Sequence, residues 1–180
     1  MPRPGEQGSA IGRLREATSS FHLKVDKEYS RFDLTDRTSY GRFLLAQTQA
    51  TGAAEAGLVL DQTLPAWRPR AHLLAEDLKL LGLAVPRPLR FAQEDRDGWL
   101  WGVLYVLEGS RLGGAVLVKR LSADVPSAFL SSRHRTGEWR TLVCSIDSLG
   151  AREGQVWLDA AIEGARDCFD LHVRAAASQP

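Results

Sequence analysis

The sequence contains few of the residues from which covalent or metal-bound frameworks are built. Its 180 residues include only two cysteines, Cys144 and Cys168, which lie far apart in the chain. A disulfide framework or a zinc site needs more cysteines at recurring short intervals. We therefore expect both thiols to be reduced and structural.

An excess of charge of one sign and a long apolar run are also missing. The 23 basic and 22 acidic residues are spread along the chain and give a formal net charge of +1, so no global field recruits nucleic acid or a membrane surface. No uninterrupted apolar segment approaches the roughly 20 residues that span a bilayer, and no apolar run follows the N-terminal "MPRPGEQGSA". The composition predicts a soluble, cytoplasmic protein that binds neither nucleic acid nor membranes.

Alternating strand patterns are absent as well, and apolar residues recur instead at helical spacing. The first helix is expected from about Ile11 to Glu28, and the second follows capping candidates at Thr35 and Asp36. Further helices are predicted in "PRAHLLAEDLKLLG", from Gly98 to Leu121, in "EWRTLVCSIDSLG" and in "EGQVWLDAAIEGARDCFDLHVRAAA", with an exposed loop at Ser131 to Glu138. These patterns predict an all-α protein with a flexible N-terminal tail at 1–10 and one domain at 11–177.

The stretch "LYVLEGSRLGGAVLVKRL", Leu104 to Leu121, reads as a buried helix with three glycines in its middle. A glycine inside a helix costs up to about 1 kcal/mol relative to alanine. Gly109 and Gly113 share one helix face, and Ser110 and Gly114 form the neighbouring pair. Two interpretations remain open: another helix packs very closely there, or a flat ligand lies on this thin face and the glycines let the helix bend over it.

The first helix carries a second candidate site. His22 lies beside the apolar stripe, and Arg15 lies two turns earlier on nearly the same face. Neutral imidazole is a common iron ligand and a guanidinium pairs well with a carboxylate, so the pair suggests haem with a propionate. The alternative is that His22 is satisfied by a carbonyl or by Asp26 while Arg15 is solvated. The remaining histidines, at positions 72, 134 and 172, have weaker claims.

Three segments resemble the haem oxygenase family, in its bacterial biliverdin-forming branch: "LREATSSFHLKVD", "LYVLEGSRLGGAVLVK" and "AIEGARDCF", in this order. The resemblance implies a helical bundle that holds haem between a proximal helix and a kinked distal helix. It implies that His22 is the axial iron ligand, that Gly109 and Gly113 lie over the iron, and that Gly114 continues the thin face.

The same resemblance implies further contacts to haem. Arg15 matches a basic residue near a propionate, and Lys119 falls where the distal helix often carries a lysine toward the haem edge. The alternative explanation of Lys119 is a solvated helix end, and Tyr105 is either a wall of the pocket or a core residue. A second propionate cation is not assigned, and Arg140, Arg152 and Arg166 are candidates.

Catalysis in this family needs space for dioxygen and ordered water beside the macrocycle, and Gly109, Ser110 and Gly113 are the residues implied to provide it. The chain departs from mammalian members at two positions of the distal helix. Ser110 replaces an aspartate that organises water, and Val106 replaces the arginine that anchors it. Oxygen activation is therefore expected to depend on Ser110, backbone carbonyls and water.

The implied activity is cleavage of haem, as substrate and cofactor, to biliverdin with release of iron and carbon monoxide. The chain has no dinucleotide fingerprint, flavin motif or iron–sulfur cysteine set, so electrons are expected from a separate ferredoxin or reductase. A local basic patch around Lys119 and Arg120 is the candidate docking face. Because the distal carboxylate is missing, a haem or tetrapyrrole carrier or sensor without catalytic activity is the alternative, and a protein of this fold without haem is a third.

Overall fold

The computed structural model describes residues 8–58, 63–92, 94 and 96–180, and the regular structure within these ranges is entirely helical. The all-α prediction is confirmed. In chain order the elements are α1 (Ala10–Tyr29), α2 (Arg37–Leu58), α3 (Ala71–Leu80), α4 (Trp99–Leu117), the 3₁₀ turn η1 (Val118–Arg120), α5 (Ala128–Ser131), α6 (Glu138–Glu153) and α7 (Gln155–Ala177).

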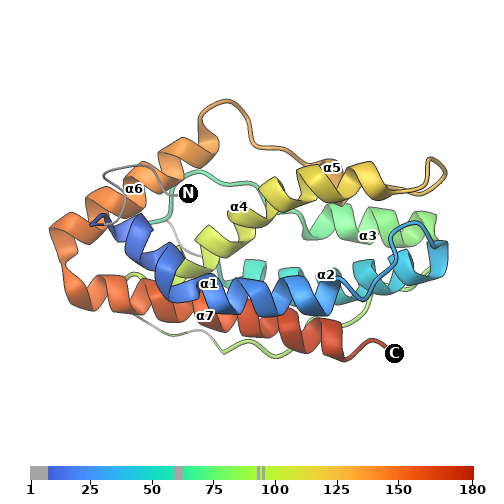
Figure 1. Cartoon of the computed structure of the whole chain (residues 1–180), viewed down its shortest axis with the longest axis horizontal. Coiled ribbons are helices and arrows are strands. Elements are labelled where there is room, and N and C mark those ends of the chain that lie inside the picture. Colours follow the sequence, from blue (N-terminus) through green and yellow to red (C-terminus); the bar gives the residue numbers. More distant parts are fainter. Residues whose placement is uncertain (1–7, 59–62, 93, 95) are drawn as a thin grey trace.

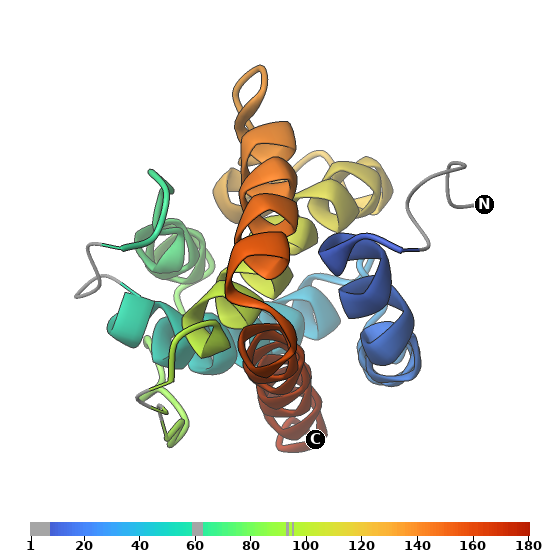
Figure 2. The same cartoon turned by 90° about the vertical axis from the view of Figure 1, so that its left-hand side faces the viewer.

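The C-terminal helix α7 organises the bundle, because α1, α2 and α4 all pack against it. Figure 1 shows α1 and α7 running together along the long axis with α4 above them, and α4 changes direction along its length. Figure 2 shows α1 on one side of the stacked α6 and α7 and α3 on the other. Gly154, with a φ of 80°, makes the abrupt junction between α6 and α7.

Helices α4 and α7 approach each other closely at Gly102 and Gly164. A Cβ on Gly102 would overlap the carbonyl oxygen of Ala161, and a Cβ on Gly164 would overlap that of Trp99. The two backbones therefore touch, and Trp99 is fully buried beside them with its indole N–H donated to Asp167 over 3.0 Å. This contact fixes where α4 lies and, with it, the segment that carries the later glycines.

Side-chain caps mark the starts of the first two helices. The Ser9 hydroxyl accepts the N–H of Gly12 at the start of α1, and the Asp36 carboxylate accepts the N–H of Ser39 over 2.7 Å at the start of α2. Thr35, the other capping candidate, donates its hydroxyl to Asp33 instead.

Other predictions need correction. The helix expected to reach Leu121 ends as α4 at Leu117 and tightens into η1, and α5 was not anticipated. The segment 131–138 is not simply an exposed loop, because His134 packs against Trp139 with ring centroids 5.7 Å apart. Most of the predicted tail, residues 1–7, lies outside the described residues. In the described part of the chain, no helix is long and apolar enough to cross a membrane.

Candidate functional site

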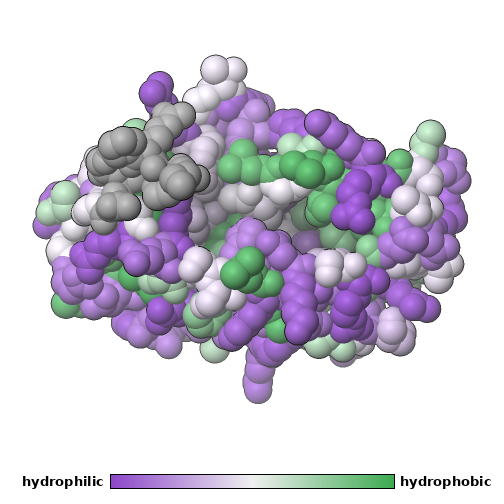
Figure 3. Space-filling model, viewed as in Figure 1, coloured by the Kyte–Doolittle hydropathy of each residue, from purple (hydrophilic) through white to green (hydrophobic). Residues whose placement is uncertain are grey.

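A cavity of about 450 Å³ opens between α1 and α4. Figure 3, in the orientation of Figure 1, shows the surface hollowed between these helices, with hydrophobic residues along one edge. This volume lies in the range of small-molecule and cofactor sites. The lining side chains are mostly apolar or aromatic, and they come from α1, α2, α4, α5, α6 and α7.

Helix α1 presents four polar residues to the cavity, and three of them recur at intervals of seven. Arg15, His22 and Tyr29 all line it, and seven residues are about two turns, or roughly 10 Å along the axis. The helix therefore offers a cation near one end, an imidazole in the middle and a phenol near the other end. Burial raises the pKa of Tyr105, and Arg15 opposes that rise through its charge and a hydrogen bond to the phenol. Arg15 and Tyr105, predicted from separate motifs, thus meet in the structure.

His22 is held by the residue one turn later. Its Nδ1 lies 3.0 Å from Oδ2 of Asp26, and the imidazole stays 62% exposed at the cavity. An ionised carboxylate only accepts, so the neutral ring carries its proton on Nδ1 and leaves Nε2 with a lone pair. The edge of the ring contacts Phe169, with centroids 5.7 Å apart. The pairing with Asp26, considered as an alternative to metal binding, instead leaves the second nitrogen available.

Three of the four glycines of α4, Gly109, Gly113 and Gly114, line the cavity, but they have different neighbours. A Cβ on Gly109 would lie 3.6 Å from the Trp139 ring, and one on Gly114 would lie 3.2 Å from the carbonyl oxygen of Leu130 in α5. A Cβ on Gly113 would meet no heavy atom within 4 Å. Both interpretations of the glycine face therefore apply to part of it: Gly114 permits a close approach of α5, and Gly113 borders open space.

Ser110 also lines the cavity, one turn before Gly114. Its hydroxyl donates to the carbonyl of Leu107 over 2.6 Å and accepts from the guanidinium of Arg70. Val106 lines the cavity too and contributes an apolar surface.

The remaining predicted cations lie elsewhere. Lys119 is exposed in η1 and does not line the cavity. Arg140 and Arg152 line two other surface hollows, near Trp101. Arg166 donates to the carbonyl oxygen of Ala17 and lies over the Phe21 ring, so it braces α1 from α7.

Several lining residues were not predicted from the sequence, among them Gln47, Phe129 and Trp139, and His172 had only a weak claim. His172 is the most informative. Its Nδ1–H donates to the carbonyl of Cys168 over 2.8 Å, and burial lowers its pKa to about 4, so the imidazole is neutral. Its place three residues after Phe169, on the buried face of α7, was the signal available.

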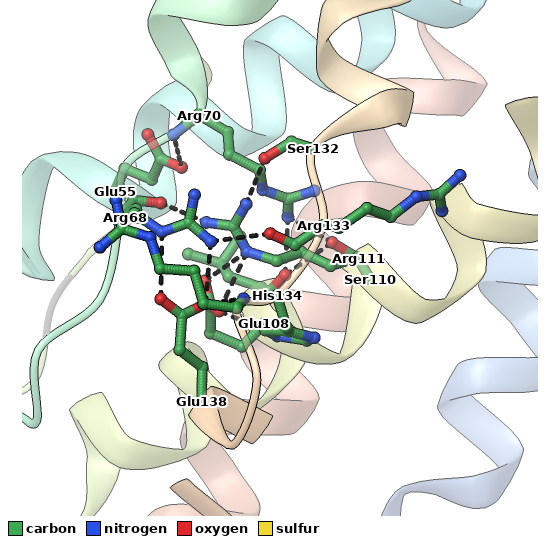
Figure 4. A network of polar contacts seen from close by, with 12 residues as sticks. Glu55, Arg68, Arg70, Glu108, Ser110, Arg111, Ser132, Arg133, His134 and Glu138 are labelled. Carbon is green, nitrogen blue, oxygen red and sulfur yellow. Dashed lines mark hydrogen bonds and ion pairs between the residues drawn. The ribbon is translucent and has the colours of Figure 1, made fainter. Parts of the chain in front are cut away.

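A polar network lies behind α4, on the side away from α1 (Figure 4). Arg111 is 2% exposed and donates through Nε to both oxygens of Glu108, at 3.0 Å each. It also donates to the Ser132 hydroxyl and the Arg68 carbonyl, and His134 lies 3.0 Å from Glu108. This network ties α4 to the segments before α3 and after α5, so the cavity wall is supported from behind.

Comparison with known proteins gives the site a family. No family model matches the chain. Heme oxygenase from Xanthomonas campestris pv. campestris is 41% identical over 64 residues, which are 33% of this chain and only 36% of that relative. Heme oxygenase PigA from Pseudomonas aeruginosa is 27% identical over 94% of this chain and 92% of its own.

A solved structure agrees with these relatives. The NO- and CO-bound heme oxygenase from Neisseria meningitidis matches with a TM-score of 0.73 and 25% identity, over 94% of this chain and 90% of that one. The similarity to PigA in sequence and to the Neisseria protein in structure thus covers nearly the whole chain. The chain belongs to the haem oxygenase family.

Proposed function

We propose that this protein is a haem oxygenase that binds haem in the cavity between α1 and α4. The reaction would open the ring to biliverdin and release iron and carbon monoxide, with electrons from an external donor. One observation carries the proposal: His22, with its Nδ1 on Asp26, lines the same cavity as the open glycine position at Gly113. The likeness to heme oxygenases over nearly the full chain supports it.

The residues that are present fit haem. Within the described residues no group of three or more His, Cys, Asp or Glu side chains could hold a metal ion, so iron bound here would need most of its ligands from a macrocycle. Nε2 of His22 would be the protein ligand, and Arg15 would pair with a propionate. Phe129, Trp139 and Phe169 give the cavity the apolar walls that a porphyrin needs.

When bound, haem would supply the iron that activates dioxygen and the ring carbon that is oxidised. The protein's part is to position it and to control polar groups nearby. Helix α4 contributes no carboxylate to the described lining of the cavity, so nothing on this helix drives premature cleavage of an O–O bond. Gly113 leaves room for dioxygen, and the Ser110 hydroxyl is available to a water.

Haem titration of the purified protein tests binding first. We expect a saturable Soret band for the parent protein and its loss, or a change in ligation, in His22→Ala. His72→Ala is the matched control, because His72 is an exposed α3 residue that does not line the cavity. A haem complex unchanged by His22→Ala would contradict the axial ligand.

Turnover separates the enzyme from a carrier. With ascorbate or a ferredoxin system, the proposal expects the Soret band to decay and biliverdin absorbance to grow. A stable haem spectrum under both reductants would favour the non-catalytic carrier.

The electron donor is proposed to dock at the basic patch formed by Lys119 and Arg120. Both are exposed in η1, directly after the helix that carries Gly113. Replacing both by glutamate should slow turnover driven by ferredoxin several-fold and leave turnover driven by ascorbate unchanged. Equal slowing with both reductants would place the effect in the active site and exclude docking there.

A further inference from the structure

Arg70 is a buried cation that reaches the cavity wall from a distant segment. It lies one residue before α3, and the N–H groups of Arg70 and Ala71 are bound by the two carboxylate oxygens of Glu55, at 2.7 and 2.9 Å. The residue is 2% exposed, and its guanidinium lies over the Phe129 ring at 4.7 Å from the centroid. Its backbone and its side chain are therefore both fixed.

The end of this side chain is bound to α4. Nη2 donates to the carbonyl of Leu107 over 2.6 Å and to the hydroxyl of Ser110 over 2.5 Å (Figure 4). Ser110 lines the cavity, whereas Arg70 lies behind it. The contact thus carries a positive charge to within one hydrogen bond of the cavity.

The hydrogen bonds of Ser110 define what its hydroxyl can do there. A serine hydroxyl has one proton and two lone pairs. The proton goes to the Leu107 carbonyl, and one lone pair accepts from Arg70. The remaining lone pair is an acceptor, so a cavity water would donate to Ser110, as it would to a carboxylate.

Arg70 stays a cation at neutral pH, although burial and the charge of Arg111 lower its pKa. The carboxylates of Glu55 on α2 and Glu108 on α4 attract the guanidinium, and Arg111 repels it. The charge of Arg70 in turn helps burial to lower the pKa of His172 on α7. Burial lowers the pKa of Arg70 to about 10, which leaves the guanidinium protonated at neutral pH.

We propose that Arg70 is a positioning residue of the reaction, acting through Ser110. Its guanidinium orients the hydroxyl as an acceptor that faces the cavity and so positions the water beside bound haem. Arg70 thereby supplies, from the segment before α3, the cation that Val106 cannot supply from α4. This inference rests on the proposed function and adds a residue to it.

The test uses full-length protein reconstituted with ferric haem, in four variants: Arg70→Met, Ser110→Ala, the double variant, and Arg68→Met. Arg68 is the control, because it belongs to the same network but binds Glu138 and the carbonyl of Arg133 and does not line the cavity. The readouts are the midpoint of the acid–alkaline transition, followed by absorbance, and the fraction of haem recovered as biliverdin.

Arg70→Met should raise the midpoint by about one pH unit, since a unit charge acting over roughly 10 Å at an effective dielectric of about 20 has that effect. Ser110→Ala should move the midpoint in the parent but not in the Arg70→Met background, because the hydroxyl would no longer be oriented. Both single variants should lower the biliverdin fraction, and Arg68→Met should change neither readout.

An equal shift from Ser110→Ala in both backgrounds would overturn the inference, as would an unchanged midpoint in Arg70→Met. If Arg70→Met does not fold, Ser110→Ala and Ser110→Thr decide. Threonine keeps the hydroxyl and should preserve both readouts, and alanine should change both; an alanine variant that matches the parent overturns the inference. Failure of the parent to bind haem would instead overturn the proposed function.

Discussion

Substitutions at Gly113 should affect the stability of α4 and the binding of a ligand in the cavity in opposite directions. A Cβ at this position would meet no heavy atom within 4 Å, so alanine adds no packing cost and gains about 1 kcal/mol of helix propensity. Gly102 is the matched control on the same helix, because its Cβ would overlap the Ala161 carbonyl of α7. Overpacking of this kind costs about 1–3 kcal/mol or more, which exceeds the propensity gain.

The ligand-free variants should therefore move in opposite directions. We expect the free energy of unfolding to rise by up to about 1 kcal/mol in Gly113→Ala and to fall by about 2 kcal/mol in Gly102→Ala. Urea unfolding followed by circular dichroism measures both.

In the presence of haem, a large side chain at position 113 should be unfavourable. In Gly113→Leu the side chain enters the space beside the ligand, and we expect haem affinity to fall at least about tenfold, which removes about 1.4 kcal/mol of ligand-induced stabilisation. If Gly113→Ala destabilised the ligand-free protein as much as Gly102→Ala, close helix packing would explain both glycines. A leucine variant with parental haem affinity would refute the placement of the ligand over this face.

Three further outcomes follow from the structure. Burial lowers the pKa of His172 to about 4 in the folded protein from an ordinary 6.5. The contribution of this residue to stability is therefore complete above pH 6.5 and is lost as the pH falls toward 4. His172→Gln should flatten the dependence of the unfolding free energy on pH in that window. Asp77 accepts the N–H groups of Ala128 and Phe129 over 2.9 Å each, so Asp77→Ala should lower the free energy of unfolding by about 1–3 kcal/mol, whereas parental stability in urea would show that α5 needs no such cap. Arg15→Met should weaken the binding of haem several-fold, measured by titration, and should leave the binding of a haem with esterified propionates unchanged. Equal losses of affinity for both haems would place the role of Arg15 in packing against Tyr105.

Much of the fold was predictable because helices are specified by residues close together in the chain. The expected first helix, Ile11 to Glu28, differs from α1 by one residue at each end, since apolar spacing and the cap at Ser9 act within a few residues. The short α5 was missed for the complementary reason. The N–H groups at its start are bound by a distant side chain, Asp77 of α3.

The candidate site was predicted only as far as single helix faces. Arg15 and His22 share a face of α1 because they are seven residues apart, and the glycine face of α4 follows from spacings of three and four. That these faces line one cavity was expected from the resemblance to a family, and the structure brings them together. Lys119 does not line that cavity and lies in η1, after α4 has ended.

The sequence by itself determined the helical class, the single glycine-rich face and the imidazole beside a cation, because each depends on contacts within about two turns. Only the tertiary structure decided which glycine borders open space and which packs against α5. It alone brought Arg70 to Ser110, 40 residues later in the chain. No periodicity encodes that contact: it exists because α2, through Glu55, and α4 fix the two residues independently, and the packing of the helices brings them within hydrogen-bond distance.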